Sequence, residues 1–78
     1  MAKAIVLINT EVGAEDEIAK VLESIPEVKE VYVVYGIYDL VAVVEAPTFE
    51  ELRSVIVTKI RRLAKIKSTT TLIVVEKG

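Results

Sequence analysis

The feature that most constrains this chain is a set of β-type runs in which apolar residues stand at consecutive positions instead of alternating with polar ones. Four such runs, rich in Val, Ile and Thr, cover residues 3–9, 28–35, 40–44 and 69–75. Successive residues of a strand point to opposite faces, so a sheet with one solvated face should alternate apolar and polar side chains. These runs therefore predict a sheet that is apolar on both faces.

Two helices are predicted between the runs. Apolar residues recur at helical spacing over residues 14–25 and again over 49–63,. Pro26 ends the first helix, and Thr48 with Glu51 predicts a capping box at the start of the second. The resulting order, βαββαβ, predicts a ferredoxin-like α+β domain with a four-stranded antiparallel sheet and two helices on one face.

The second sheet face is expected to be buried by self-association. The 78 residues are interpreted as a single domain, 1–78, with 76–78 as a short polar tail. A chain of this length buries only about 60% of its unfolded surface, and it has no cysteine or histidine for disulfides or Cys/His zinc sites,. Helices on one face would leave roughly several hundred Å² of apolar sheet exposed. A sheet-to-sheet homodimer of the dimeric α/β-barrel type is the simplest closure.

Charge and hydropathy narrow the partners and the location. The net charge of −2 and a pI near 5.1 provide no electrostatic basis for binding nucleic acid or an anionic membrane,. No apolar run approaches the ~18 residues of a membrane span, and no signal peptide opens the chain, so a cytoplasmic protein is expected. The excess of Glu and Lys, with Gln, Cys, His and Trp absent, is typical of a thermophile,.

Few residues suit catalysis. Without Cys and His, the commonest nucleophiles, general bases and metal ligands are missing, so neither an enzyme nor a metal or cofactor site is predicted,. Asp39 follows two tyrosines and precedes a Val-rich run. It either stabilises the hairpin by accepting hydrogen bonds from backbone amides or is a carboxylate that binds a cationic ligand group. Thr69 and Thr71 share one strand face, as ordinary strand residues or as hydroxyl contacts for a small polar ligand.

Taken together, these motifs resemble the effector-binding (RAM) domain of the Lrp/AsnC, or feast/famine, transcription regulators. The resemblance covers essentially all 78 residues and is strongest over residues 26–40. There, a Pro and a Val open the second strand and a Gly-x-Tyr-Asp turn, Gly36 to Asp39, follows it. The Thr-x-Thr entry to the last strand, Thr69 and Thr71, is a weaker match.

The resemblance implies a sheet-to-sheet dimer that assembles into rings or discs, commonly octamers of four dimers. It also implies an amino-acid effector bound between dimers, near the Gly-x-Tyr-Asp turn. Gly36 would allow close backbone approach, Tyr38 would help to wall the pocket, and Asp39 would face the amino group. Thr69 and Thr71 would be hydroxyl contacts.

Two departures from the family pattern matter. Family members normally carry an N-terminal helix-turn-helix domain, whereas here the first strand begins at once, so DNA binding is not implied. Tyr35 stands where a small hydroxyl residue is frequent, which leaves the size of the pocket and the identity of the amino acid open.

The expected function is a stand-alone regulatory domain that acts alone or by co-assembly with full-length regulators. The alternatives are a structural assembly module without ligand, an enzyme or haem-handling protein of the dimeric α/β-barrel kind, and an ACT domain. The absence of histidine disfavours the enzyme. The ACT domain normally pairs along edges, which would leave the apolar sheet face unexplained.

Overall fold

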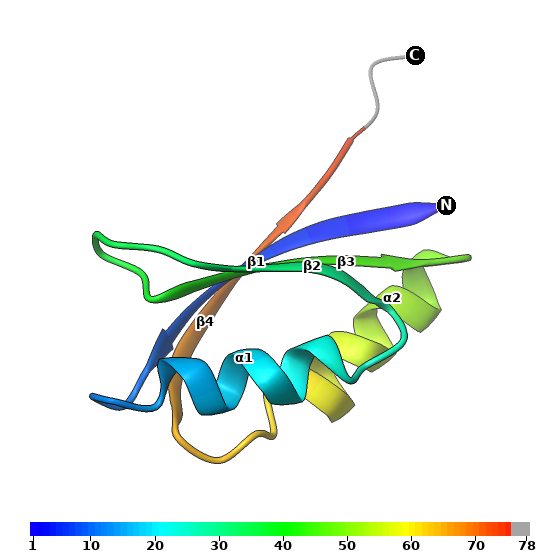
Figure 1. Cartoon of the computed structure of the whole chain (residues 1–78). Helices are drawn as coiled ribbons and strands as arrows, with labels where there is room; N and C mark the ends of the chain where they lie inside the picture. Colours follow the sequence, from blue (N-terminus) through cyan, green and yellow to red (C-terminus); the bar gives the residue numbers. More distant parts are fainter. Residues whose placement is uncertain (76–78) are drawn as a thin grey trace.

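The computed structural model describes residues 1–75 and has the predicted βαββαβ order (Figure 1). Its strands are β1 (Ala2–Thr10), β2 (Val28–Val33), β3 (Leu40–Ala46) and β4 (Ile66–Ile73). Its helices are α1 (Glu15–Glu23), α2 (Phe49–Val55) and a π-helical turn, η1 (Ile56–Ile60), that continues α2. The expected polar tail, 76–78, lies outside the described residues. None of the helices described is long and apolar enough to cross a membrane.

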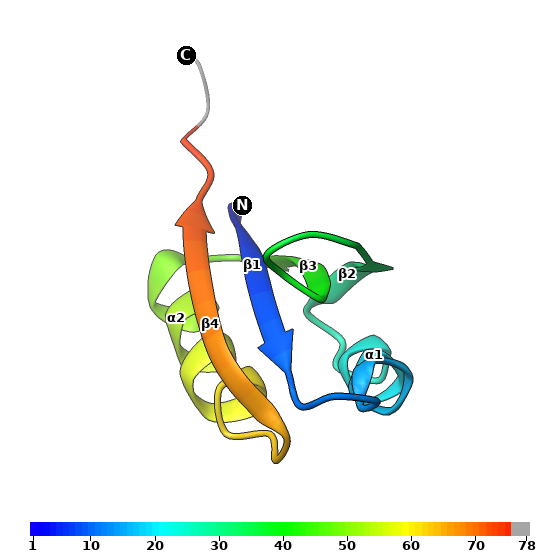
Figure 2. The same ribbon diagram turned by 90° about the vertical axis from the view of Figure 1, so that its left-hand side faces the viewer.

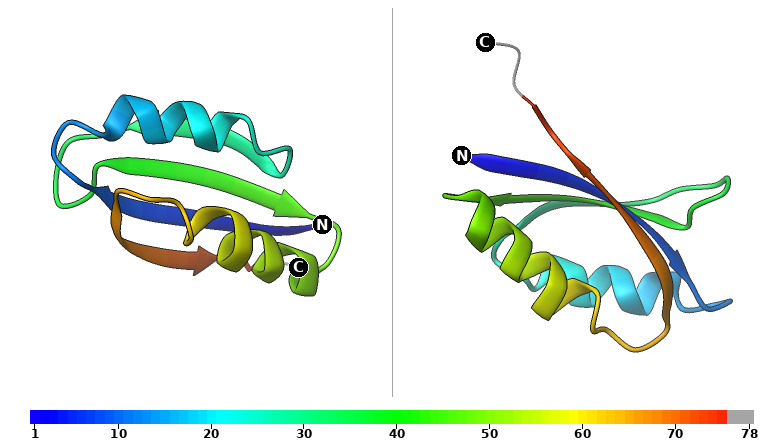
Figure 3. Two further views of the ribbon diagram at one scale, coloured as in Figure 1. Left: turned by 90° about the horizontal axis from the view of Figure 1, so that it is seen from below. Right: turned by 180° about the vertical axis from the view of Figure 1, so that it is seen from behind.

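The four strands form one antiparallel sheet in the order β2-β3-β1-β4, and both helices lie on the same side of it (Figures 1 and 3). The ferredoxin-like α+β fold is thereby confirmed. β1 and β3 occupy the centre of the sheet, and Figure 2 shows β4 next to β1 at one edge.

The core lies between the helices and the sheet. Alternate residues of the two central strands face the helices and are fully buried: Ala4, Val6, Ile8, Leu40, Ala42 and Val44. They meet residues spaced at the helical period, namely Ile18 and Leu22 of α1 and Leu52, Ile56 and Ile60 of the second helical segment,. The two periods, 2 in the strands and 3.6 in the helices, bring these side chains onto facing surfaces.

The opposite sheet face carries a second apolar surface, which none of the helices within residues 1–75 covers (Figure 1). The register pairs Ile5 with Val43 and Leu72, and Leu7 with Val41, so these five side chains point away from the helices. We call them the open-face band. Leu72 is 47% exposed in the single chain, although Val43 is already shielded by its neighbours at 9%. Both sheet faces are therefore apolar, as the runs of consecutive apolar residues predict.

Polar residues border this band. Lys3 faces Glu45 across β1 and β3, and on β2 the Tyr32 hydroxyl donates a hydrogen bond to the carboxylate of Glu30. That bond and the negative charge of Glu30 raise the pKa of Tyr32 above its ordinary value. An apolar centre with a polar rim is the usual anatomy of a protein interface.

The second helix differs from the expected uninterrupted α-helix. Residues 49–55 are α-helical, but the next turn is a π-helix, closed by a hydrogen bond of 2.9 Å from the amide of Arg61 to the carbonyl of Ile56. A π turn contains about one residue more than the ~3.6 of an α turn. The extra residue rotates Ile60 toward Leu52 and the core, where Ile60 is fully buried.

β4 begins at Ile66, earlier than the predicted residue 69, because its backbone pairs with the end of β1. Lys65 precedes it with a positive φ of 72°, and its carbonyl accepts a 2.8 Å hydrogen bond from the amide of Glu11. This contact joins two loops that are far apart in the sequence. Such pairing depends on the register of β1, so local composition around Lys67 does not indicate it.

The predicted N-cap can be tested by substitution. The Thr48 hydroxyl accepts a 3.1 Å hydrogen bond from the amide of Glu51. Thr48→Ala should therefore lower the free energy of unfolding by about 1 kcal/mol. Thr58→Ala is the control, because the Thr58 hydroxyl only bonds back to the Ser54 carbonyl within the helix, and its loss should change stability by less than about 0.5 kcal/mol,. Urea unfolding at one fixed protein concentration measures both, and equal effects would contradict the capping role.

Candidate functional site

The hairpin between β2 and β3 carries the Gly-x-Tyr-Asp motif. Its ends are joined by a 3.0 Å bond from the amide of Val34 to the carbonyl of Asp39, and the amide of Asp39 bonds to the carbonyl of Ile8 on β1 at 2.9 Å. Gly36 has a φ of +142°, a conformation that side-chain-bearing residues rarely adopt, although a Cβ there would meet nothing within 4 Å,. Within the chain, Gly36 is therefore needed for its backbone conformation and not for lack of space.

Asp39 is half-buried and reaches from the hairpin to the end of β1. Its Oδ2 accepts a 2.9 Å hydrogen bond from the amide of Thr10 and lies 3.5 Å from the Thr10 hydroxyl. Thr10 is only 5% exposed, and the pairing of β1 with β4 shifts register between Asn9 and Thr10. The carboxylate thus satisfies a backbone amide at an irregular strand end. Its second oxygen, Oδ1, has no hydrogen-bond partner within residues 1–75.

A depression of about 300 Å³ lies beside Asp39. Its walls, which define what we call the hairpin depression, are Val33, Val34, Tyr35, Asp39, Glu15 and Asp16. The last two come from the first turn of α1. Among the described residues, three carboxylates and no cationic side chain line the depression, so its local field favours a positively charged group,.

Tyr38 points to a different part of the molecule from Asp39. Its hydroxyl lies 3.2 Å from the hydroxyl of Thr70, whose side chain shares the open face with Leu7. Tyr38 therefore covers one end of the open sheet face, while the carboxylate of Asp39 accepts a hydrogen bond from the amide of Thr10.

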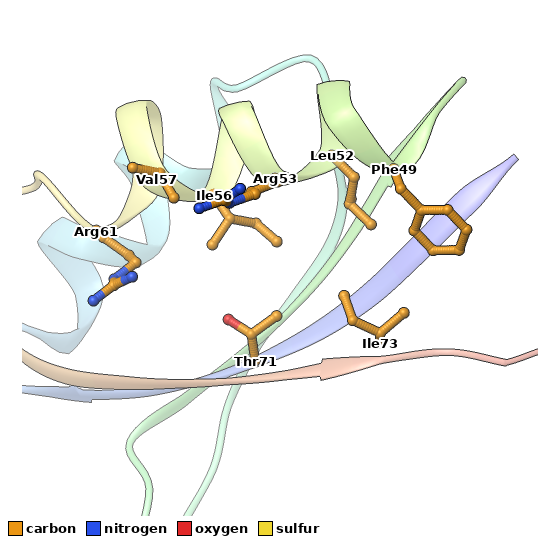
Figure 4. A pocket seen from close by; sticks show the side chains of 8 residues that line it. All are labelled: Phe49, Leu52, Arg53, Ile56, Val57, Arg61, Thr71 and Ile73. Carbon is orange, nitrogen blue, oxygen red and sulfur yellow. The ribbon is translucent and has the colours of Figure 1, made fainter.

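Thr69 and Thr71 share one face of β4, as predicted, and it is the face on the helix side. They pair with Ile8 and Val6, whose side chains lie in the core. Thr71 points toward the second helical segment (Figure 4). A single chain thus brings Gly36, Tyr38 and Asp39 together in one hairpin and holds the two threonines on another strand.

Sequence reasoning missed three residues of this region: Thr10, Glu15 and Asp16. Thr10 lies just after the first predicted strand, residues 3–9, and Glu15 and Asp16 are in the first turn of α1, where the helix dipole alone accounts for negative charge,. The position of these three residues beside the hairpin could have been inferred from the strand order. In a βαββαβ sheet β1 lies next to β3, so the end of β1 and the start of α1 meet the β2–β3 hairpin.

Two ion pairs tie the second helical segment and the loop after it to the rest of the chain. Lys59 Nζ lies 3.2 Å from the carboxylate of Glu27, and Lys65 Nζ lies 2.9 Å from that of Glu17. The pKa of Glu27 is lowered by a hydrogen bond from its own backbone and by Lys59, and the pKa of Lys65 is raised by Glu17. All four side chains are on the surface, where such pairs contribute little to stability.

The fold and the site define a class: small ferredoxin-like domains with an apolar open sheet face and a ligand-sized depression at the β2–β3 hairpin. Comparison with known proteins identifies the family. Residues 3–77 match the model of the Lrp/AsnC ligand binding domain. Because this match covers nearly the whole sequence, the chain belongs to that family.

Individual proteins similar to this chain agree with the family assignment. The chain is 43% identical over 58 residues to the regulatory protein AsnC of Haemophilus influenzae, which covers 74% of this chain but only 39% of that protein. It matches the crystal structure of FFRP-DM1 at 44% identity with a TM-score of 0.93, over 96% of this chain and all of the other. The hypothetical protein PHS023 from Pyrococcus horikoshii matches at 43% identity and a TM-score of 0.92, over 99% of this chain and 93% of that one.

Substitution of Asp39 tests its contact with β1. Asp39→Ala should lower the free energy of unfolding by about 1–3 kcal/mol, because the buried amide of Thr10 loses its partner,. Asp39→Asn keeps an oxygen that accepts this bond and should cost less than about 1 kcal/mol. Denaturant unfolding of both variants measures the difference, and equal losses would mean that the charge and not the hydrogen bond stabilises the strand end.

Proposed function

We propose that this chain is a regulatory module that binds a free amino acid and assembles through its sheet into dimers and larger oligomers. The observation that carries the proposal is the hydrogen bonding of the Asp39 carboxylate. One carboxylate oxygen is held by the amide of Thr10, and the other faces no hydrogen-bond partner in the described chain, beside a depression with acidic and apolar walls. An ammonium group with an apolar side chain complements such a site.

A distant relative offers further support. A transcriptional regulator from Neisseria meningitidis, solved as its complex with L-Met, has the same fold, with a TM-score of 0.78 at 15% identity over 97% of this chain and 51% of that one. An amino acid is therefore the ligand class that we assign to this chain. Gly36 would set the backbone of the hairpin that carries Asp39, whereas Tyr38, whose hydroxyl contacts Thr70, would reach a ligand only from the open sheet face.

We infer that a second copy completes the site. Thr69 and Thr71 lie on β4 and do not meet Asp39 within one chain, so their contribution as hydroxyl contacts requires a neighbouring dimer. A ligand bound between dimers contacts residues that only the assembled state brings together. Binding would then shift the assembly equilibrium by mass action, which makes the module a sensor.

Assembly begins with the open-face band in this proposal. Ile5, Leu7, Val41, Val43 and Leu72 would pack against the same residues of a two-fold partner, giving a dimer of the α/β-barrel type,. Four such dimers would form the octamer. The rim residues Lys3, Glu30 and Glu45 would surround the contact.

The partners of the module would use the same surfaces. We place the module in the cytoplasm, acting alone or by joining full-length regulators through its dimer and oligomer contacts. With a net charge of −2, contact with DNA would come from such regulators and not from this chain,. Neither catalysis nor membrane binding forms part of the proposed role.

One observation favours a second candidate, an assembly module that binds no ligand. The bond from the Thr10 amide to Asp39 is what a purely structural carboxylate would make. The two candidates share the sheet-face dimer and differ only in the role of the free oxygen.

Leu72 provides the test of assembly. Leu72→Lys places an ammonium group within the open-face band, which the sheet-to-sheet contact would bury and where an unpaired charge costs about several kcal/mol, so the variant should be monomeric at micromolar concentration,. The wild type should give a light-scattering mass near that of eight 8.6 kDa chains, roughly 70 kDa,. Val43→Lys should also dissociate the dimer, but Val43 is already shielded in the single chain, so Leu72 is the cleaner site.

Val12→Lys is the matched control, because Val12 is fully exposed in the turn before α1 and lies off the sheet. Its mass should equal that of the wild type. A monomeric wild type would contradict the proposed assembly.

Asp39→Asn tests ligand binding. A thermal-shift screen of the twenty amino acids identifies the strongest binder, and calorimetry then compares the two proteins. Loss of a charge-assisted hydrogen bond, about 1.5–3 kcal/mol, should weaken binding by roughly ten- to a hundred-fold while the oligomeric mass stays the same. Equal affinities would remove Asp39 from the ligand site, and a wild type that binds no amino acid at millimolar concentration would favour the assembly module.

A further inference from the structure

The charges of this chain are divided between its two lateral sides. Figure 2 shows α1 and β2 along one side of the molecule and α2 and β4 along the other. Residues 11–33, which we call the acidic side, carry seven acidic and two basic side chains, a net charge of −5. Residues 49–73, the basic side, carry two acidic and six basic side chains, a net charge of +4. The net charge of −2 for the whole chain therefore results from two opposite, separated charges,.

Only part of this charge is neutralised within the chain. Lys59 and Lys65 of the basic side each hold a glutamate of the acidic side, at 3.2 and 2.9 Å. Within residues 1–75, the other charged side chains of the two sides form no ion pair. They include Glu15 and Asp16 on the acidic side and Arg61 and Arg62 on the basic side. Both sides thus carry charges that a single chain leaves without a partner.

The unpaired carboxylates adjoin the tip of the β2–β3 hairpin. Glu15 and Asp16 line the hairpin depression together with Tyr35 of the tip. The Tyr35 side chain is fully exposed, and that of Ile37 is 83% exposed. Burial of these side chains would favour association. The acidic side therefore presents an apolar tip beside two negative charges.

The basic side carries the complementary pattern. A depression of about 330 Å³, which we call the edge depression, lies between the second helical segment and β4 (Figure 4). Phe49 and Ile73 face each other at one end and are 61% and 48% exposed, and the Arg61 guanidinium lies toward the other end. Arg62, the next residue in the chain, is exposed as well. The basic side therefore presents an apolar depression beside two positive charges.

We propose that the acidic side of one sheet-to-sheet dimer docks on the basic side of the next dimer. The hairpin tip enters the edge depression of the neighbour and covers its exposed apolar side chains. The carboxylates of Glu15 and Asp16 then lie opposite the two adjacent guanidinium groups of the neighbour, a pairing that arginine favours. The docking rests on the proposed assembly of four dimers and assigns the surfaces that join them.

A second copy of the chain suits both surfaces, because each chain carries one side of each kind. A dimer that has docked on its neighbour therefore keeps sides free for the next dimer. Contacts between unlike surfaces repeat in this way and close into a ring where the rotation allows it. The sheet-to-sheet contact uses the same face of both chains and so ends at the dimer. The docking also brings the hairpin of one dimer to β4 of the next, as the proposed ligand site requires.

Charge also determines which sides meet and under which conditions. Two acidic or two basic sides repel each other, so the opposite charges select the pairing of unlike sides. Exposed charges are screened beyond about 10 Å at 0.1 M salt and beyond about 3 Å at 1 M salt. The open-face band is apolar, so the sheet-to-sheet contact does not depend on this attraction. The two contacts should therefore respond differently to ionic strength.

Light scattering on the full chain, without added amino acid, tests the docking. The wild type should be an octamer at about 0.1 M NaCl and should shift toward dimers at about 1 M NaCl, because screening weakens only the charged contact. The constant for dissociation of the octamer into dimers should rise by about ten-fold or more over this range.

Charge reversal on the two sides provides the sharper test. Glu15→Lys with Asp16→Lys gives a chain with two basic contact surfaces, and Arg61→Glu with Arg62→Glu gives a chain with two acidic ones. Each double variant alone should remain a dimer, because its like-charged sides repel, and retention of the dimer shows that it is folded. An equimolar mixture of the two variants should form octamers, since every contact then joins opposite charges again.

Glu50→Lys with Glu51→Lys is the matched control. These residues occupy the first turn of α2, as Glu15 and Asp16 occupy the first turn of α1, so the changes in net charge and in the interaction with the helix dipole are the same,. The control residues lie on the basic side, which becomes more basic. The control variant should therefore remain an octamer.

Octamers formed by either double variant alone, or a mixture of the two that stays dimeric, would overturn the docking and leave the proposed octamer in place. Loss of the octamer in only one of the two double variants would assign that side to a different partner, which also overturns it. Dissociation of the control would mean that net charge and not the contact controls assembly. A wild type that is a dimer at every salt concentration would reject the octamer itself, and the docking with it.

Discussion

The pairing of β1 with β3 on one side and with β4 on the other is the interaction on which the rest of the structure depends. β1 contributes fully buried Ala4, Val6 and Ile8 to the core and turns Ile5 and Leu7 to the open face. Apolar burial stabilises a fold by about 25 cal/mol per Å², and the helices bury only one face of this sheet. The stability of the single chain is therefore coupled to whatever covers the other face.

The end of β1 has a second role, since it connects the sheet to the hairpin. β1 loses its regular register at Thr10, and Asp39 supplies the acceptor that the Thr10 amide needs. A buried amide without a partner would cost about 1–3 kcal/mol, so the carboxylate is fixed in place by the fold itself. Fixing one oxygen leaves the other without a hydrogen-bond partner within residues 1–75. In the proposed function, the same contact would both stabilise the strand end and position the carboxylate for a ligand.

The helices cover the sheet unevenly. β4 lies at the edge, beyond the strands on which α1 and α2 pack, and both of its faces remain partly exposed. Leu72 on one face belongs to the open-face band, and Thr71 and Ile73 on the other line a depression of about 330 Å³ beside the second helical segment. One strand thus contributes to two separate surfaces, because adjacent residues of a strand point in opposite directions.

The sequence by itself determined the element order and the two apolar faces of the sheet, because these depend on local periods of 2 and 3.6 residues. It also determined the cap at Thr48, because a hydroxyl residue at that position accepts a hydrogen bond from the amide three residues later,. It also singled out the hairpin through Gly36 and Asp39. Only the tertiary structure decided that Asp39 reaches Thr10, that Thr71 faces the helical segment, and that a π turn brings Ile60 into the core. These contacts join residues far apart in the chain or reflect the demand to bury Ile60. They depend on strand register and core packing, which local composition does not encode.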